Sequence, residues 1–214
     1  MKTLILVPTQ MERLSLVESL PKVTKQHSVE LSGFGAIAAA AVASQRLSQS
    51  NYQRVFLTGI AGTYNEKQVA VGEAYSFDYV QCDGIGVGSG PSYQSSSELG
   101  WNQIDTDPMI RDRIKLNNPE SIKERSGVNG KEMTLLTGCS ASADALEAHE
   151  RAQRYPTAVA EDMEGFGVAM ACQLDQTPLT IIRGISNQAG DRNHHDWKIK
   201  QAMQSAAKLL AEFL

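Results

Sequence analysis

Several kinds of residue are scarce in this chain, and each scarcity excludes a class of protein. Only 3 of the 214 residues are cysteines, and no two of them form a CxxC pair. A zinc finger or a disulfide-stapled fold needs more, so we expect reduced thiols that pack in the interior. Basic residues do not exceed acidic ones: 20 Lys and Arg stand against 24 Asp and Glu, for a net charge of -4. Without a broad positive surface, we expect no nucleic acid partner.

Long hydrophobic runs are also missing. The longest run of small apolar residues, 34–43, falls far short of the ~20 residues that cross a bilayer. The apolar stretch before Pro8 is too short for a secretory signal. We therefore expect a cytoplasmic chain without membrane contact, and its 214 residues fit one domain, 1–214.

The apolar pattern alternates between a strand period and a helix period, which is typical of an α/β fold. It predicts one three-layer αβα domain with a central, mostly parallel, mixed sheet. The expected strands are 3–7, 28–31, 54–58, a strand pair within 69–80, 133–137, 157–160 and 178–185. The expected helices are 10–20, 36–48, a short one after Pro108, 142–154, 163–172, and a last one from residue 199. Residues 81–107 have no regular pattern, and an irregular segment of that length is usually functional or mobile.

The first helix is expected to begin after a Thr9 cap and to end at Pro21. Its apolar residues, Met11, Leu14, Val17 and Leu20, fall on one stripe, which we expect to face the core.

Two short motifs favour structure over chemistry. Residues 33–38 fit the GxGxxA dinucleotide pattern, but the next strand ends without the acid that would hold a ribose, so a tight turn is the better interpretation. His194 and His195 are adjacent and would point apart on a helix, so a solvated helix start is favoured over a metal site. We expect no metal and no organic cofactor.

Polar residues follow three of the expected strands. Glu12 follows the first, Glu164 follows the strand 157–160, and Arg183 to Asn187 close the strand 178–185. In open α/β sheets, ligands bind beyond the carboxyl ends of the strands. The order of these groups predicts that they converge on one pocket.

The order and spacing of several motifs resemble the purine nucleoside phosphorylase/nucleosidase superfamily. These motifs are residues 8–12 (PTQME), 33–35 (GFG), 58–62 (TGIAG), 137–138 (TG), 162–165 (DMEG) and 183–187 (RGISN). The most specific is the acid-Met-Glu-Gly motif, followed about twenty residues later by Arg-x-Ile-Ser.

This resemblance implies a role for each matching residue. Glu12 would activate the attacking water, and Asn187, backed by Ser186, would face the imidazole side of the purine. The remaining substrate contacts would be Met163 and Glu164 on the ribose, Ala61 and Gly62 along the ribose and base site, and backbone groups near Ser142 on the other edge of the base.

The chemistry fits these residue types. Cleavage of a ribosidic bond builds positive charge on the sugar and negative charge on the base. A carboxylate at Glu12 can take a proton from water, and Glu164 can bond a sugar hydroxyl more strongly as charge develops.

Within the superfamily, the chain looks most similar to futalosine hydrolase, which releases hypoxanthine from futalosine in menaquinone biosynthesis. Methylthioadenosine/adenosylhomocysteine nucleosidases place an aspartate at the position of Asn187, and an aromatic residue where we align Ala141. An amide offers both a donor and an acceptor, which suits a 6-oxopurine. Trp197, within ten residues of Asn187, fits the futalosine hydrolase pattern or packs the last helix.

Three alternatives stay open. The chain could be a methylthioadenosine/adenosylhomocysteine nucleosidase, or a phosphorylase, although the Gly-x-Pro-x-Arg phosphate turn is missing and only Arg13 lies near that place. It could also be a nucleoside-binding sensor without turnover. The family usually forms homo-oligomers, so the resemblance implies a dimer or larger assembly.

Overall fold

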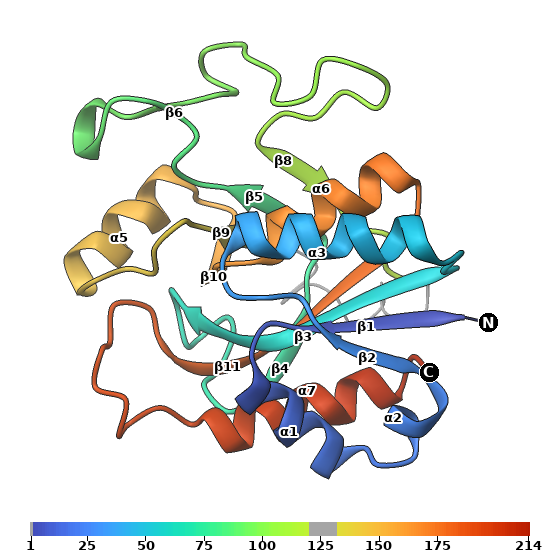
Figure 1. The fold of residues 1–214 in the computed structure, drawn as a ribbon. Helices are drawn as coiled ribbons and strands as arrows, with labels where there is room; N and C mark the ends of the chain where they lie inside the picture. Colours follow the sequence, from blue (N-terminus) through green and yellow to red (C-terminus); the bar gives the residue numbers. More distant parts are fainter. Residues whose placement is uncertain (1, 120–131) are drawn as a thin grey trace.

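The computed structural model describes residues 2–119 and 132–214, and within them the core is a nine-stranded mixed sheet (Figure 1). Its main path runs β2-β1-β3-β10-β9-β5-β8, while β11 pairs with β3 and β4. Five pairs are parallel (β1–β2, β1–β3, β3–β11, β5–β9 and β9–β10) and three are antiparallel (β3–β10, β4–β11 and β5–β8). The strands are β1 (Thr3–Val7), β2 (Ser28–Leu31), β3 (Arg54–Thr63), β4 (Ala74–Ser76), β5 (Tyr79–Cys82), β8 (Arg113–Lys115), β9 (Thr134–Thr137), β10 (Ala158–Asp162) and β11 (Leu179–Gln188).

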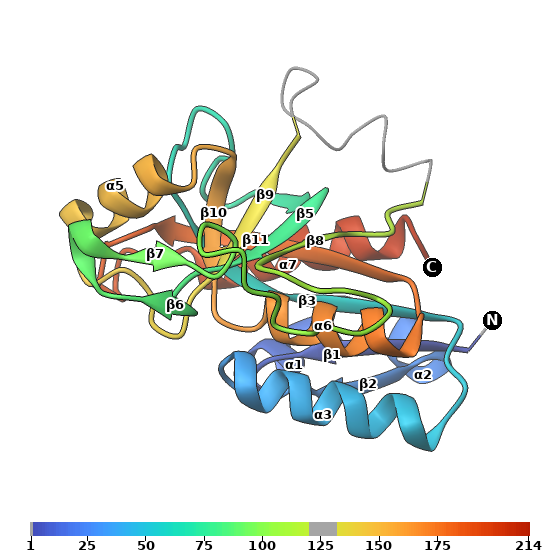
Figure 2. The same ribbon diagram turned by 90° about the horizontal axis from the view of Figure 1, so that it is seen from above.

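Helices cover both faces of this sheet, so the three-layer expectation is confirmed (Figures 1 and 2). One face carries α3 (Ala36–Gln49) and α6 (Gly165–Asp175), and the other carries α1 (Gln10–Ser19) and α7 (Ile199–Ala211). Two shorter helices, α2 (Val23–Gln26) and η1 (Gly90–Ser92), the helix α5 (Ala145–Arg154), and a small sheet of β6 (Gly86–Val87) and β7 (Gln94–Ser95) complete the described elements.

The first strand shows why its apolar run is unbroken. Leu4 and Leu6 enter the core beneath α3 and α6, whereas Ile5 and Val7 enter the core beneath α1 and α7. A strand buried on both faces needs an apolar side chain at every position. The predicted bounds 3–7 are therefore the observed ones.

The alanine-rich helix α3 packs closely against α6. A Cβ on Gly167 of α6 would meet the carbonyl oxygen of Ala36 at 2.1 Å. Only a glycine permits this approach, which fixes α6, and hence the residues before it, against the start of α3.

Two local predictions are wrong. No helix follows Pro108: Ile104 and Ile110 form an antiparallel bridge, so the proline lies in the bend between them. Most of the apolar stripe of the first helix also turns away from the core: Met11 is 51% and Leu14 59% exposed, although Leu20 packs against the core. The face of α1 that turns inward is the one that carries Glu12 and Leu16.

Five of the described elements escaped the sequence analysis because they are short: α2 has four residues, η1 and β8 have three each, and β6 and β7 have two each. None of the helices in the described ranges has the length and apolar character needed to traverse a bilayer.

Candidate active site

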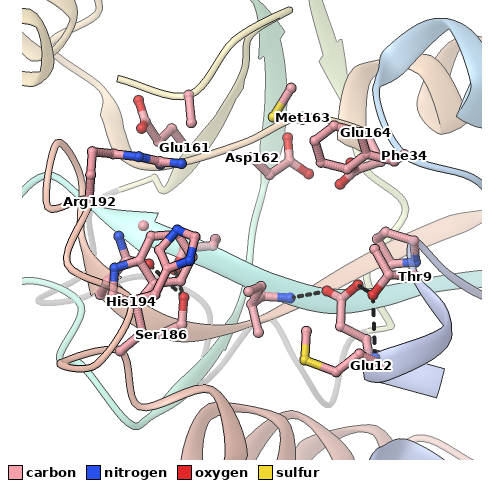
Figure 3. Close-up of a pocket in the computed structure, with 18 residues that line it drawn as sticks. Thr9, Glu12, Phe34, Glu161, Asp162, Met163, Glu164, Ser186, Arg192 and His194 are labelled. Atoms are coloured by element: carbon pink, nitrogen blue, oxygen red, sulfur yellow. Dashed lines mark hydrogen bonds between the residues drawn. The ribbon is translucent and has the colours of Figure 1, made fainter. Parts of the chain in front are cut away.

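A cavity of about 320 Å³ opens where several strands end (Figure 3). Its wall is built from the segment after β1, from the ends of β3 and β11, from the junction of β10 with α6, and from the segment before α7. Such a volume suits a small organic ligand. Seven of the eight predicted site residues line it: Glu12, Ala61, Gly62, Met163, Glu164, Ser186 and Asn187.

Glu12 is held rigidly although its helix lies at the surface. Its Oε1 accepts a hydrogen bond from the backbone N–H of Ile60 at 2.9 Å, and its Oε2 accepts one from the Thr9 hydroxyl at 2.5 Å. The same hydroxyl caps α1 by accepting from the Glu12 backbone N–H at 3.3 Å. With only 3% of the residue exposed, the carboxylate is fixed toward the cavity and can take a proton from a bound molecule.

Arg183 lies fully buried behind the cavity between acidic side chains. Its Nε donates to Asp162 at 3.1 Å and its Nη2 lies 3.2 Å from Glu164, with a further close contact between Nη2 and Asp162. Its Nη1 is buried without a hydrogen-bond partner in the described structure. A Cβ on Gly59 would meet this Nη1 at 2.4 Å and Glu12 Oε1 at 2.7 Å, so glycine leaves the space that both groups face.

Glu164 begins α6, as predicted, and reaches back across the chain. Its Oε1 accepts from the backbone N–H of Gly35 at 3.0 Å. Burial raises the pKa of this carboxyl to about 7; Arg183 works against the rise, while Asp162 and Glu12 add to it. One guanidinium beside three carboxylates leaves excess negative charge, and Glu164 is the group that responds by holding its proton more tightly.

A β-bulge places Ser186 and Asn187. Ile185 pairs with Ala61 and Asn187 with the next residue, Gly62, so one extra residue lies on β11. Consecutive residues of a regular strand point to opposite faces, but here both Ser186 and Asn187 line the cavity. The Ser186 hydroxyl donates to Asn187 Oδ1 at 2.6 Å, and Asn187 Nδ2 donates to the Gln188 carbonyl at 2.8 Å and the Asp191 carbonyl at 3.5 Å.

Ser142 is the one predicted site residue that does not line the cavity, although its neighbour Ala141 does. Its N–H donates to Glu161 Oε1 at 2.9 Å and its hydroxyl to Glu161 Oε2 at 2.6 Å. Glu161 also accepts from Tyr64 at 2.8 Å and from Arg151 at 3.3 Å. This buried network supports the loop that carries Ala141.

The segment between β11 and α7 contributes three residues that the sequence analysis did not place in the site: Arg192, His194 and Trp197. The rings of His194 and Trp197 are in contact, with centroids 4.4 Å apart and planes tilted by 54°, and the Arg192 guanidinium lies 5.2 Å from the centre of the Trp197 ring. The segment is exposed and irregular, so Trp197 was the only signal. The histidine pair forms no metal cluster, and within residues 2–119 and 132–214 no other group of metal-binding side chains does.

The two ends of the cavity carry different charged groups. In Figure 3, Arg192, His194, Ser186 and Glu161 lie on one side, and Glu12 and Glu164 on the other. Glu161 is already paired with Arg151, whereas Arg192 adds a positive charge, so this cavity can stabilise a molecule that becomes positive at one end and negative at the other.

Comparison with known proteins agrees with this architecture. Residues 20–214 match the family model described as the phosphorylase superfamily. A futalosine hydrolase from Acidothermus cellulolyticus is 32% identical over 164 residues, covering 74% of this chain and 63% of that protein. A 5'-methylthioadenosine/S-adenosylhomocysteine nucleosidase from Colwellia psychrerythraea is 24% identical over 193 residues, covering 86% of this chain and 76% of that protein.

Among solved structures, the native futalosine hydrolase of Helicobacter pylori is similar, with a TM-score of 0.77 and 16% identity over 100% of this chain and 98% of that one. At this identity the likeness concerns the fold. The chain spans 61–63% of the length of the two futalosine hydrolases, from Streptomyces coelicolor and Acidothermus cellulolyticus, that it matches.

Proposed function

The chain belongs to the phosphorylase superfamily, and from this membership we propose that it is a purine nucleosidase that hydrolyses futalosine to hypoxanthine and dehypoxanthine futalosine. The observation that carries the proposal is the meeting of Glu12, Glu164 and Asn187 around one cavity. The similarity to futalosine hydrolases supports the choice of substrate.

In this reaction Glu12 takes a proton from the water that attacks the sugar carbon. Arg183 holds Asp162 and Glu164 in place from behind the cavity, which leaves Glu12 as the group that accepts the proton of that water. Glu164 accepts a hydrogen bond from a ribose hydroxyl, and Met163 packs on the sugar. The carboxylates also stabilise the positive charge that develops on the ribose.

Asn187 faces the departing purine at the opposite end. Its Nδ2 contact with the Asp191 carbonyl, at 3.5 Å, is long enough to be exchanged for one with the base. An amide cannot deliver a proton, which favours a 6-oxopurine over adenine. Ala61, Gly62 and the backbone near Ser142 complete the walls around the base and the ribose.

Water is favoured over phosphate as the acceptor. Arg13 does not line the cavity, Arg183 is already bound to Asp162 and Glu164, and Arg192 lies on the side away from Glu12. A phosphate beside Glu12 would meet a like charge.

The alternative substrate is 5'-methylthioadenosine or S-adenosylhomocysteine, as the similarity to the Colwellia psychrerythraea nucleosidase suggests. Adenine benefits from a proton donor, and the position that would supply one is an asparagine here. A nucleoside-binding protein without turnover is the other alternative, and both retained carboxylates argue against it.

We further propose that residues 1–214 act as one domain and assemble as a homo-oligomer in the cytoplasm. Apolar side chains near the cavity are unusually exposed: Met11, Leu14, Phe34 at 66% and Ile37 at 83%. Met11 and Phe34 also line the cavity, so a second copy packed on this surface would cover its rim.

The test measures hypoxanthine release from futalosine in phosphate-free buffer, with methylthioadenosine in parallel. We expect release without phosphate, and a kcat about 10²- to 10⁴-fold lower in Glu12→Gln, because the amide keeps the shape but cannot accept a proton. The dissociation constant for the substrate should stay unchanged. Glu18→Gln, an exposed position on the same helix, is the matched control.

Each other outcome has a distinct meaning. A requirement for phosphate would identify a phosphorylase, and cleavage of methylthioadenosine alone would change the substrate. Binding without any release would identify a sensor.

A further inference from the structure

The proposed reaction leaves a negative charge that Asn187 cannot remove. The bond between C1′ and N9 breaks, its electron pair goes to the purine, and a bond forms between C1′ and the water oxygen. Glu12 takes one proton of that water. The purine therefore departs as an anion, and its charge has to be stabilised at the base end of the cavity.

Arg192 carries an uncommitted positive charge at this end. In the described part of the chain its guanidinium makes no hydrogen bond or ion pair, and its contact is with the face of Trp197 at 5.2 Å. An arginine beside an aromatic ring keeps its charge and loses little entropy when it binds a partner.

The Asp191 carbonyl anchors Trp197, since it accepts from Trp197 Nε1 at 3.1 Å. Asn187 Nδ2 lies 3.5 Å from the same oxygen. Trp197 and Asn187 are thus neighbours, which brings the Arg192 guanidinium to the same end of the cavity as the base-recognising amide. Figure 3 shows Arg192 on the side of Ser186 and Glu161, away from Glu12 and Glu164. Glu161 is paired with Arg151 at 3.3 Å and accepts from Ser142 at 2.6 Å, so it leaves the charge of Arg192 available to a ligand.

We propose that Arg192 is a catalytic residue that stabilises the departing purine anion, an inference that rests on the proposed nucleosidase reaction. Its charge opposes the carboxylates at the sugar end, so the cavity matches both charges of the transition state. The other arginine near the cavity, Arg183, is fully buried and paired with Asp162 and Glu164, so it does not serve this purpose.

The experiment varies the stability of the leaving anion. It compares futalosine with its 8-aza analogue, in which C8 of the base is nitrogen; the shape is nearly kept, and the departing anion is more stable. Arg192→Gln should lower kcat on futalosine by about 10- to 100-fold and on the analogue by no more than about threefold. Arg192→Lys should lie between the wild type and Arg192→Gln.

Lys200→Gln is the matched control, since it removes one positive charge from an exposed position of α7 that does not line the cavity. Equal losses on both substrates in Arg192→Gln would overturn the inference, because a structural role does not depend on the leaving group. A loss on futalosine without a loss on inosine would also overturn it, since the guanidinium would then bind the acidic substituent of futalosine. Loss in His194→Gln but not in Arg192→Gln would transfer the role to the histidine.

These outcomes are separate from a failure of the proposed function. If the wild type releases no base from any of these nucleosides, the nucleosidase proposal fails. If the wild type is active and Arg192→Gln matches it on every substrate, this inference alone fails.

Discussion

Replacing Asn187 with aspartate tests how the cavity chooses between purines. The amide donates through Nδ2 to the carbonyls of Gln188 and Asp191, while Oδ1 accepts from Ser186. In Asn187→Asp the Ser186 contact remains, but an oxygen replaces Nδ2 and faces two carbonyl oxygens. An ionised carboxylate would repel both.

The size of the effect follows from these contacts. Asn187 is 8% exposed, and a buried polar group that loses its partner costs about 1–3 kcal/mol. Because one pKa unit corresponds to about 1.4 kcal/mol, the introduced carboxyl should titrate about 1–2 units above the usual value near 4. The charged form lowers the free energy of unfolding, so Tm should fall by about 2–10 °C at pH 8 and by less at pH 5.

The protonated form has a further consequence. A carboxyl that keeps its proton near pH 5–6 can donate it to the base, as an amide cannot. The ratio of kcat/KM for methylthioadenosine to that for futalosine should therefore rise at least about tenfold in Asn187→Asp, and rise further toward low pH.

The assay measures this ratio and the Tm between pH 5 and 8, with Gln188→Glu as the control. Gln188 is the next residue and is exposed, so this variant adds the same charge outside the cavity. An unchanged ratio in Asn187→Asp, or an equal change in Gln188→Glu, would refute the role assigned to Asn187.

Two further predictions concern other parts of the site. With the pKa of Glu164 raised to about 7, kcat/KM should fall about tenfold per unit as pH decreases below about 7, because the protonated group binds the sugar hydroxyl less well. The free energy of unfolding should change in the opposite sense. Because the folded protein holds this proton more tightly than the unfolded chain, the contribution of Glu164 to stability declines as pH rises from about 4.5 to about 7. A pH profile of kcat/KM checks the first sign, and chemical denaturation at several pH values checks the second. Ile37→Glu introduces a charge at a position that is 83% exposed, so Tm should change by no more than about 2 °C. The same charge should dissociate the proposed oligomer, which analytical ultracentrifugation would detect as a lower mass. An unchanged mass would place the interface elsewhere.

The parts of the fold that could be predicted from sequence are those where burial dictates each residue. β1 and most of β11 are buried on both faces, so their apolar runs mark them directly. The carboxylates Glu12 and Glu164 were found because they follow such strands. The orientation of α1 was not predictable, since the hydrogen bond from Ile60 to Glu12, rather than the apolar stripe, sets which face turns inward.

Arg192 illustrates a second limit. It lies in an exposed segment without periodicity, and its place in the cavity depends on the irregular turn in which the Asp191 carbonyl accepts from the Trp197 side chain. Contacts of this kind leave no pattern in the sequence.

The bulge in β11 separates core packing from substrate contact, which adjacent residues of a regular strand would have to serve on opposite faces. Ile185 stays in the core, while the two residues after it both reach the cavity. A substitution at Asn187 can therefore alter the base that is accepted without repacking the hydrophobic interior. Base preference and core packing are thus set by neighbouring but different residues of one strand.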